Sequence, residues 1–369
     1  MAIPSVSLVM SVFNGERFLR EAVESILNQS FCDFEFIIID DGSTDNSGSI
    51  LASYQRSDPR IRTYHQENRG LIHSLNRGCA LAQGKYIARM DADDIAVRDR
   101  LTWQFTFMEE HPEVAVLGGA FELIGQTGEV LRVVRHPLEP RELERAILES
   151  SAICHPSAFI RKTAFIAAGG YRNVLDAEDY DLWLRIAEHH PLANLPDILL
   201  KYRLHLGQVS VARCRSQALG TVAARTAASA RRSGKPDPLD SVGEVTPALL
   251  ARLGVSESTQ HTTLARGYLS TIRNMCDAGE YTHALNTLEV LHSSELKHAE
   301  IWTIADLRLC AAEVYWHKNR FARSILTAAH AAITRPAILG RPVKQLVQRL
   351  TLLFRQLKWG GLIQSDTSI

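Results

Sequence analysis

Residues 85–94 read Lys-Tyr-Ile-Ala-Arg-Met-Asp-Ala-Asp-Asp, and this stretch decides the fold class. Its apolar start predicts a buried strand that follows Gly84. The aspartates Asp91, Asp93 and Asp94 therefore fall where the strand gives way to a loop, and in open α/β sheets ligands gather beyond the carboxyl ends of strands. Carboxylates this close repel one another, and a divalent cation that prefers hard oxygen ligands relieves the repulsion. Because acidic triplets also occur as solvated turns or helix N-caps, the triplet alone does not establish a site.

A second group of acids ends an earlier strand. Residues 36–39 are a short, continuous apolar run, as expected of a strand that is buried on both faces. The run ends at Asp40 and Asp41, and a Gly-Ser-Thr-Asp turn follows at residues 42–45. Two strands that deliver acids to one edge of a sheet favour a binding site more strongly than either strand does alone.

The start of the chain predicts a βαβ unit. Residues 6–10 form the first apolar run, and residues 18–27 carry their apolar side chains on one face of a helix. A strand, helix and strand in this order are joined by a right-handed crossover. Further along, residues 121–125 and 130–134 flank a Gln-Thr-Gly-Glu turn and predict a hairpin. The expected fold class is therefore α/β.

Six segments, taken in order, resemble the inverting family 2 glycosyltransferases, which have the GT-A fold. The segments are residues 6–16, 38–43, 67–70, 88–94, 178–183 and 202–205. Ser11 departs from the family pattern, which usually has proline at this place, and the departure is expected to reduce the stiffness of the loop.

The resemblance implies a GT-A type nucleotide-binding mixed sheet that is flanked by helices. It also implies a metal-dependent, inverting transfer of a sugar from a nucleotide diphosphate sugar to a hydroxyl acceptor. The cofactor would be Mn²⁺ or Mg²⁺, and the acceptor a glycan, a lipid-linked glycan or a protein in bacterial surface glycan or glycoconjugate synthesis. Residues 155–156 and 169–171 also match family positions and are expected near the donor sugar and the acceptor.

The metal contacts implied by the resemblance lie at both ends of the expected catalytic domain. Asp91 and Asp93 match the metal-binding motif, with Asp93 as the direct ligand. His205 matches a histidine that closes on the diphosphate or the metal. Asp94 would either support these ligands or cap the next helix, and Arg89 would either face the ribose or diphosphate or serve as a packing residue.

The nucleoside pocket implied by the resemblance is formed by the earlier loops. Val12 and Asn14 would lie along the base and ribose, and Asn68 is carried over to the same pocket. Asp40 or Asp41 would accept a hydrogen bond from the base. Uracil presents one imide N–H to such an acceptor, which makes UDP the first expectation. Thymine presents the same group, so dTDP stays open, and GDP stays open as well.

The general base implied by the resemblance is Asp179, which would take the proton of the acceptor hydroxyl during a single displacement. Its neighbour Glu178 would support it, and Asp181 would be structural or would orient the acceptor. Acids at a helix N-terminus also occur simply because they complement the helix dipole. Arg203 and Gln208 would help to close a lid over the diphosphate.

Composition agrees with a cytoplasmic enzyme. The chain has 369 residues, of which 46% are hydrophobic, and its 41 basic residues balance its 41 acidic ones, so no general nucleic-acid surface is expected. The six cysteines are scattered without CxxC spacing, which predicts reduced and mostly buried thiols. No N-terminal signal precedes the first strand, and no apolar run approaches the ~18 residues of a membrane span.

Three regions are expected: a catalytic domain at residues 1–212, a helical segment and linker at 213–240, and an all-helical domain at 241–369. Within the last region, residues 278–285 and 318–325 each combine a polar turn with an aromatic residue at the start of a helix. The pair is similar to tetratricopeptide helical hairpins, and the alternative is a small helical bundle.

The segment at residues 341–359 is basic, free of acids, and apolar at helical spacing. Such a helix can lie in a membrane interface, which would place the enzyme peripherally at the inner face of the membrane. The alternative is a final helix that packs on the helical domain.

Two other functions fit the acidic groups. A two-metal nuclease or nucleotidyltransferase would use the same carboxylates, but the neutral chain has no basic stripe and no Gly-rich, Lys-bearing phosphate loop after the first strand. A non-catalytic scaffold with a degenerate sheet domain would not require the intact acids.

Overall fold

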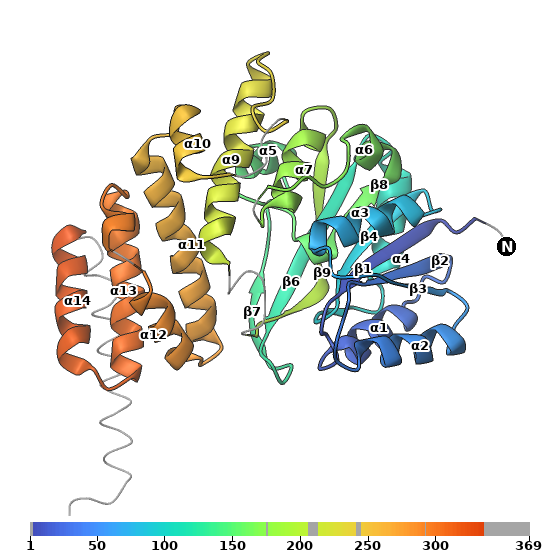
Figure 1. The fold of residues 1–369 in the computed structure, drawn as a ribbon, viewed down its shortest axis with the longest axis horizontal. Helices are drawn as coiled ribbons and strands as arrows, with labels where there is room; N and C mark the ends of the chain where they lie inside the picture. Colours follow the sequence, from blue (N-terminus) through green and yellow to red (C-terminus); the bar gives the residue numbers. More distant parts are fainter. Residues whose placement is uncertain (1–2, 175, 206–212, 241–244, 292, 336–369) are drawn as a thin grey trace, which may run out of the picture. The chain divides into compact units, whose positions relative to one another are not determined.

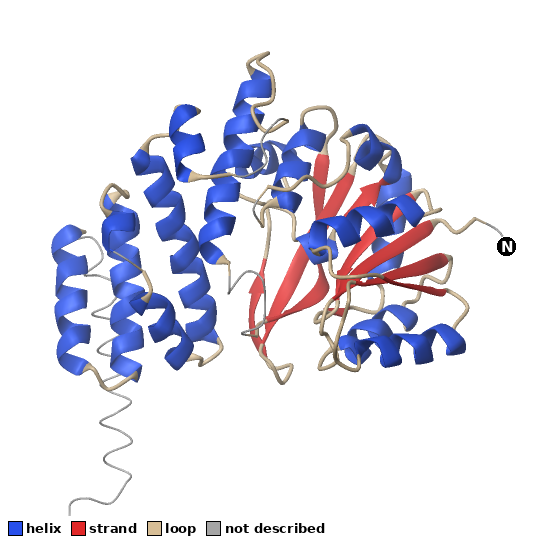
Figure 2. Cartoon of the chain, in the orientation of Figure 1, coloured by secondary structure: helices blue, strands red, loops and turns tan. Residues whose placement is uncertain are grey.

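The computed structural model describes residues 3–174, 176–205, 213–240, 245–291 and 293–335. Contacts divide the chain into two compact units, residues 1–267 and 268–369. The first unit holds a sheet with helices on both of its faces, and the described part of the second unit is helical (Figures 1 and 2). Residues 213–240 belong to the first unit. The expected end of the catalytic domain at residue 212 stays a prediction.

The sheet of the first unit is mixed, and its strand order is β3-β2-β1-β4-β8-β6-β9-β5, with β7 paired to β6. Strands β1 to β4 run parallel, and β8 joins β4 in the antiparallel sense. Strands β6 and β7 form the predicted antiparallel hairpin. The strands are β1 Val6–Val12, β2 Phe34–Asp40, β3 Ile61–His65, β4 Tyr86–Asp91, β5 Ile95–Ala96, β6 Val116–Ile124, β7 Val130–Val134, β8 Phe159–Arg161 and β9 Leu192–Arg203.

Helices cover both faces of the sheet because successive side chains of a strand point to opposite faces. Leu8 and Met10 of β1 pack into one core with α1, α2 and α4, whereas Val9 packs into the other core with α3, α5, α7 and α9. Figure 1 shows α3 and α1 on opposite sides of β1 and β2. The continuous apolar runs seen in the sequence are thus strands that are buried on both faces.

The helices of the first unit alternate with single strands from β1 to β4 and less regularly after it. They are α1 Leu19–Leu27, α2 Ser47–Ser57, α3 Leu71–Leu81, α4 Arg100–Glu110, α5 Pro140–Glu149, α6 Lys162–Ala167, α7 Glu178–Ala187, α9 Cys214–Arg232 and α10 Pro247–Arg252, with a 3₁₀ turn at His155–Ser157. The predicted βαβ unit is confirmed as β1-α1-β2, with parallel pairing of the two strands.

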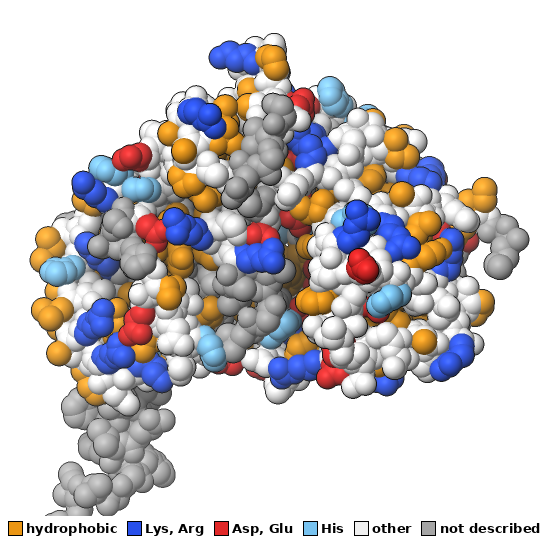
Figure 3. Space-filling model, in the orientation of Figure 1, with side chains coloured by type: hydrophobic (Ala, Val, Ile, Leu, Met, Phe, Trp, Pro, Cys, Tyr) orange, Lys and Arg blue, Asp and Glu red, His pale blue; other side chains and the backbone are white. Residues whose placement is uncertain are grey.

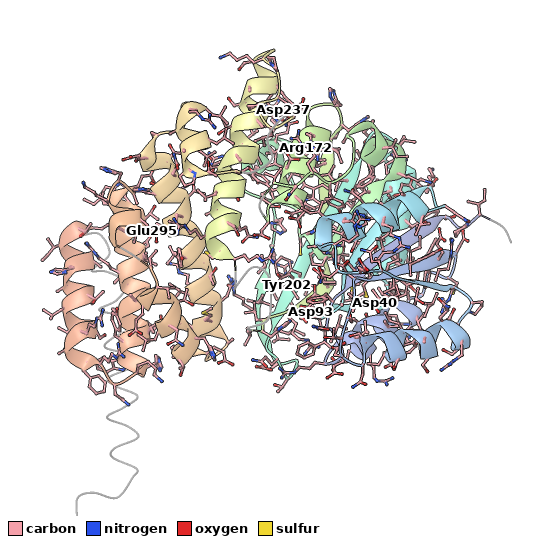
Figure 4. The ribbon with its side chains drawn as sticks, viewed as in Figure 1. Asp40, Asp93, Arg172, Tyr202, Asp237 and Glu295 are labelled. Atoms are coloured by element: carbon pink, nitrogen blue, oxygen red, sulfur yellow. The ribbon has the colours of Figure 1, made fainter. Side chains whose placement is uncertain are left out.

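Helix α9 and the segment that follows it are fixed to α7. Arg231 pairs with Glu188 at the end of α7 at 2.6 Å, and it also pairs with Asp237. Arg172 donates to Asp237 at 3.0 Å, and Figure 4 shows these two side chains next to each other. The linker expected at residues 233–238 is therefore attached to the sheet domain by partly buried ion pairs of Asp237.

The described part of the second unit, up to residue 335, consists of helices joined by short turns. Helix α11, Glu257–Asp277, crosses the boundary between the units and leads to α12 Tyr281–Glu289, a 3₁₀ turn at Ser293–Leu296, α13 Ile301–His317 and α14 Phe321–Thr334. The predicted helical C-terminal region is confirmed, and its tetratricopeptide-like character stays a proposal. The segment 341–359 and Gln208 lie outside the described residues.

Three further expectations can be compared with the structure. All six cysteines are free thiols, and each of them except Cys32 is buried. Among the described residues, no helix combines the length and the apolar character needed to cross a bilayer. On the face drawn in Figure 3, acidic and basic side chains are interspersed.

Candidate active site

The register of the parallel strands brings the two groups of acids together. Val12 at the end of β1 pairs with Asp40 of β2, and the preceding Ser11 pairs with Asp91 of β4. Because these strands are adjacent and parallel, the acids leave the sheet at the same edge. Figure 4 shows Asp40 and Asp93 at this edge.

The three aspartates after β4 form a cluster that could hold a cation. One carboxylate oxygen from each of Asp91, Asp93 and Asp94 lies within 4.8 Å of the others. Asp91 and Asp93 are half-buried and Asp94 is buried. His205 reaches the cluster from the end of β9, with its Nε2 2.8 Å from Oδ2 of Asp93. The structure thus brings His205 next to Asp91 and Asp93, the other expected metal contacts.

The charge of this cluster is only partly compensated. Burial raises the pKa of Asp94 well above its usual value, and the charges of Asp93 and Asp91 raise it further. Burial also raises the pKa of Asp91, against the opposing charge of Arg89. Arg89 is buried and donates to Asp91 at 2.5 Å. It therefore acts on the acids of the cluster directly.

Arg203 anchors the loop that carries these acids. Its backbone N–H donates to Oδ1 of Asp94 at 2.8 Å, and its guanidinium donates to the carbonyl of Asp93 at 2.9 Å. The same guanidinium pairs with Glu21 of α1 at 2.6 Å and lies 4.5 Å from the ring centre of Phe18. The side chain is 2% exposed, so it holds the loop from within the fold.

Two buried residues behind the cluster carried no signal in the sequence. Arg100, fully buried on α4, donates to the carbonyl of Arg89 at 2.7 Å. It also donates to Gln104, which donates in turn to the carbonyl of Ser157 at 2.8 Å. Both residues belong to an ordinary helix in the sequence, and only the folded chain shows that they fix the end of β4.

The second acid pair has a structural component. Asp41 accepts hydrogen bonds from the backbone N–H groups of Arg69 and Gly70 at 2.9 and 2.8 Å, and from Gln66 at 2.7 Å. Burial disfavours its charge, but these bonds hold the pKa of Asp41 below its usual value. Asp41 therefore ties the loop at residues 66–70 to the end of β2.

Asp40 makes fewer bonds of this kind. It accepts from the backbone of Ser43 at 3.0 Å and lies 2.9 Å from Nδ1 of His65. A carboxylate offers about four acceptor positions, so Asp40 retains more capacity than Asp41. Gly42 has φ +79°, and a Cβ there would lie 2.7 Å from the backbone nitrogen of Asn68. The close approach of the two loops thus requires glycine.

The other expected nucleoside contacts differ in their exposure. The side chain of Val12 is fully buried in the core, so only its backbone borders the site. Asn14, with φ 51°, accepts from the backbone of Thr44 at 2.8 Å and is exposed. Asn68 is exposed on the facing loop.

The acids at the start of α7 have separate surroundings. Asp181 is fully buried, accepting from Arg172 at 2.6 Å and from Arg185 at 2.8 Å. This geometry favours the structural one of its two expected roles. Glu178 is also buried, whereas Asp179 is half-buried. Asp179 is therefore the most accessible of the three acids.

The electrostatic environment of α7 raises the affinity of these acids for protons. Burial raises the pKa of Asp179 to about 6, while hydrogen bonds from backbone N–H groups and the charge of Arg89 limit the rise. Burial, followed by the charge of Asp179, raises the pKa of Glu178 to about 7. The charge of Asp91 also raises the pKa of Asp179, so the acids after β4 and those at the start of α7 interact electrostatically.

The pair formed by the half-buried His155 and the buried Tyr171 joins two segments that the resemblance had placed near the sugar, and the charge of Asp179 acts on Tyr171. His155 Nε2 lies 3.0 Å from the hydroxyl of Tyr171. Asn76 of α3 fixes the backbone of Tyr171 with bonds of 2.8 and 3.0 Å. Burial lowers the pKa of His155 well below its usual value, so this histidine is neutral at pH 7. Asn76 had no signal in the sequence.

Comparisons with known proteins identify the family of the chain. The model of the family described as "Glycosyl transferase family 2" matches residues 7–168. The O-antigen biosynthesis glycosyltransferase WbnJ of Escherichia coli is 31% identical over 204 residues, which cover 54% of this chain and 80% of WbnJ. The amylovoran biosynthesis glycosyltransferase AmsE of Erwinia amylovora is 34% identical over 201 residues, 53% of this chain and 75% of AmsE.

The fold is shared with a solved structure. S. aureus TarS 1-349, in complex with UDP-GlcNAc, aligns with a TM-score of 0.53 and 16% identity, covering 91% of this chain and 92% of that chain. The fold is of the GT-A type, as expected. The chain belongs to the family 2 glycosyltransferases, a class whose relatives include enzymes of O-antigen and exopolysaccharide biosynthesis.

Proposed function

We propose that the protein is a metal-dependent, inverting glycosyltransferase that moves a sugar from a UDP-sugar to a hydroxyl acceptor. One observation supports this proposal above all. The carboxylate cluster at the end of β4 and the proton-accepting Asp179 at the start of α7 are close enough for their charges to interact. A cation site and a base are the two groups that a direct displacement at a nucleotide diphosphate sugar needs.

The residues present fit a divalent cation. Carboxylate oxygens are the ligands that Mn²⁺ and Mg²⁺ prefer. Within the described residues, Oδ2 of Asp94 is buried and has no hydrogen-bond partner. Buried polar atoms are normally bonded, so this oxygen is available to interact with a cation. Asp93 and Asp91 would hold the ion, with His205 beside Asp93. When bound, the ion would neutralise the charge that develops on the leaving diphosphate.

Asp179 would accept the proton of the acceptor hydroxyl as its oxygen attacks the anomeric carbon. A raised pKa brings this carboxylate closer to the operating pH, which suits a general base. Glu178 would support Asp179 as its neighbour, since the charges of the two carboxylates interact. Asp181 would keep the first turn of α7 in place through Arg172 and Arg185. The neutral His155 and Tyr171 would border the sugar.

The nucleoside would be read at the loops after β1 and β2. Asp40 is the better acceptor for the imide N–H of uracil, since three bonds already commit Asp41 to the loop at 66–70. The backbone of Val12 and the side chains of Asn14 and Asn68 would contact the base and ribose. Arg203, buried beneath the acidic loop, would support the site by holding Asp93 and Asp94. The expected lid role of Gln208 concerns a residue outside the described ones.

The relatives named for O-antigen and amylovoran biosynthesis suggest the biological setting. We extend this to a role in bacterial surface glycan or glycoconjugate synthesis, with a glycan, a lipid-linked glycan or a protein as the acceptor. Family membership favours this reading over a nucleotidyltransferase that would use the same acids.

The test is a donor panel. The protein is incubated with Mn²⁺ or Mg²⁺ and with UDP-, GDP- and dTDP-sugars, and slow hydrolysis of each donor is measured with and without a chelator. Metal-dependent release of UDP, with inversion at the anomeric carbon in a product formed with a hydroxyl acceptor, is the expected result. Hydrolysis of GDP-sugars alone would overturn the nucleotide assignment, and chelator-insensitive turnover would overturn the metal assignment.

A further inference from the structure

Tyr171 is held in place by a side-chain clamp from helix α3. The amide of Asn76 donates to the carbonyl of Tyr171 at 2.8 Å, and its Oδ1 accepts from the backbone N–H of the same residue at 3.0 Å. An amide that bonds both backbone groups of one residue fixes its orientation, as a residue of a neighbouring antiparallel strand does. The two residues are 95 positions apart in the sequence, so only the fold makes this contact.

The rest of the loop around Tyr171 is also fixed. Gly170 has φ +72°, and a Cβ on it would lie 2.9 Å from Oδ1 of Asn76, so the clamp needs glycine at this position. The carbonyl of Gly170 accepts from Arg185 of α7 at 2.7 Å. The ring of Tyr171 packs edge-on against Phe165, with 5.4 Å between the ring centres. The backbone and the ring of Tyr171 are thus held independently of its hydroxyl.

The hydroxyl of Tyr171 decides which nitrogen of His155 carries the proton. Tyr171 is 4% exposed, and among the described residues its hydroxyl has one hydrogen-bond partner, Nε2 of His155 at 3.0 Å. A buried O–H normally finds an acceptor, so the hydroxyl donates and Nε2 accepts. In a neutral imidazole one nitrogen accepts and the other carries the hydrogen. Because burial lowers the pKa of His155 and keeps its ring neutral, the hydrogen is on Nδ1.

Nδ1 of His155 is available to a ligand. Among the described residues it makes no hydrogen bond, and it is not one of the buried atoms that lack a partner, so it borders solvent. Besides burial, the charge of Arg89 lowers the pKa of His155. Burial raises the pKa of Tyr171, and the charges of Asp179 and Glu178 contribute to the rise. The pair of His155 and Tyr171 is therefore within electrostatic reach of both the end of β4 and the start of α7.

We propose that Tyr171, clamped by Asn76, is a positioning residue that holds His155 as the Nδ1–H tautomer, and that this N–H donates to a hydroxyl oxygen of the transferred sugar. The inference rests on the proposed transfer from a nucleotide diphosphate sugar, which brings the sugar between the cation site and the base. A fixed N–H binds a sugar whose hydroxyl lies opposite it and is left unpaired by a sugar without that hydroxyl. His155 thereby selects the donor sugar, and Asn76 and Tyr171 set this selectivity without touching the sugar.

The first experiment reads the tautomer in the full-length protein. With ¹⁵N-labelled histidine, the couplings of the ring nitrogens to Hε1 and Hδ2 show which nitrogen is protonated, and His155→Gln identifies this ring among those of the 14 histidines. Tyr171→Phe keeps the aromatic ring and removes the hydroxyl, so a population protonated at Nε2 should appear. Tyr54→Phe, which removes a hydroxyl bonded to the exposed Glu24, should change nothing. A proton on Nε2 in the wild type, or an unchanged tautomer in Tyr171→Phe, would overturn the proposal.

The second experiment separates the sugar from the nucleotide. Isothermal titration in Mn²⁺ compares UDP with the UDP-sugar that the donor panel prefers. Loss of one hydrogen bond should weaken binding of the UDP-sugar about tenfold in His155→Ala and less in Tyr171→Phe, while the affinity for UDP stays unchanged. Asn76→Asp, which keeps the acceptor and loses the donor to Tyr171, should behave like Tyr171→Phe. His190→Ala, in the exposed turn after α7, should leave both affinities unchanged.

The two ligands also distinguish a sugar contact from a general effect on the fold. If His155→Ala weakened UDP and the UDP-sugar equally, or weakened neither, the sugar contact would be overturned. Failure of the proposed function gives a different result. If the donor panel selects GDP in place of UDP, the proposed nucleotide is wrong, and the same comparison of GDP with the GDP-sugar still decides the contact. The tautomer is read without any ligand and depends on neither nucleotide.

Discussion

Two acidic clusters, one after β4 and one at the start of α7, look alike in the sequence and differ in the fold. One carboxylate oxygen from each of Asp91, Asp93 and Asp94 lies within 4.8 Å of the others, and the guanidinium of Arg89 is bonded to Asp91. At α7, Asp181 is bound by two arginines while Asp179 stays half-exposed. Crowded carboxylates suit a cation, and a separated carboxylate with a raised pKa suits a proton. The difference teaches that the partners of each acid, more than its position in a motif, decide its chemistry.

The largest expected effect tests the α7 side of the comparison. Asp179→Asn keeps the shape of the side chain and removes the proton acceptor, so glycosyl transfer should fall by about 10²–10⁴. UDP binding in Mn²⁺ should stay as in the wild type. Single-turnover transfer and nucleotide titration measure the two effects. The exposed Asp197→Asn is the control, and near-normal transfer by Asp179→Asn would remove this residue from the role of base.

The next effect concerns stability and separates Asp181 from its neighbour. Asp181→Asn leaves Arg172 and Arg185 without their shared carboxylate, and breaking a buried ion pair from one side costs about 3–5 kcal/mol. Denaturant unfolding of the first unit should show this loss. Asp240→Asn removes a 71% exposed partner of Arg172 and should cost about 1 kcal/mol or less. Equal stability of the two variants would contradict the structural role of Asp181.

The β4 cluster should respond through metal binding. Asp93→Asn removes a ligand charge and the partner of His205, so the Mn²⁺ concentration that supports UDP binding should rise by at least about 10–100-fold, the range found when metal sites lose supporting groups. Isothermal titration of UDP at a series of Mn²⁺ concentrations measures the change, and Asp197→Asn again serves as the control. If the Mn²⁺ dependence stayed as in the wild type, the cation would have to be held elsewhere.

The smallest effect is a pH profile. A base must be deprotonated to accept a proton, and the pKa of Asp179 is raised to about 6. The transfer rate should therefore fall as the pH drops below about 6, by about tenfold per unit, and should level off above it. UDP binding measured over the same range separates this effect from loss of the metal. A rate that stays constant from about pH 5 to 7 would show that the base has an ordinary carboxylate pKa.

Much of the sheet and its loops could be predicted from the sequence alone. The apolar runs at residues 6–10 and 36–39 and the run before Asp91 became strands because continuous burial on both faces leaves a local pattern. The family follows from motifs in a fixed order, and the match at residues 7–168 bears it out. The acids at strand ends were recognisable because parallel strands share a carboxyl edge.

The tertiary structure alone decided what each polar side chain does. Arg203 lies 109 positions from Asp94 in the sequence, yet its backbone N–H binds that acid. Asn76, Arg100 and the burial of Asp181 likewise depend on contacts between distant segments, which leave no local periodicity. Sequence thus determined where acids leave the sheet, since strand pattern is local. Packing determined which acid is paired and which is accessible, because burial and charge depend on the whole fold.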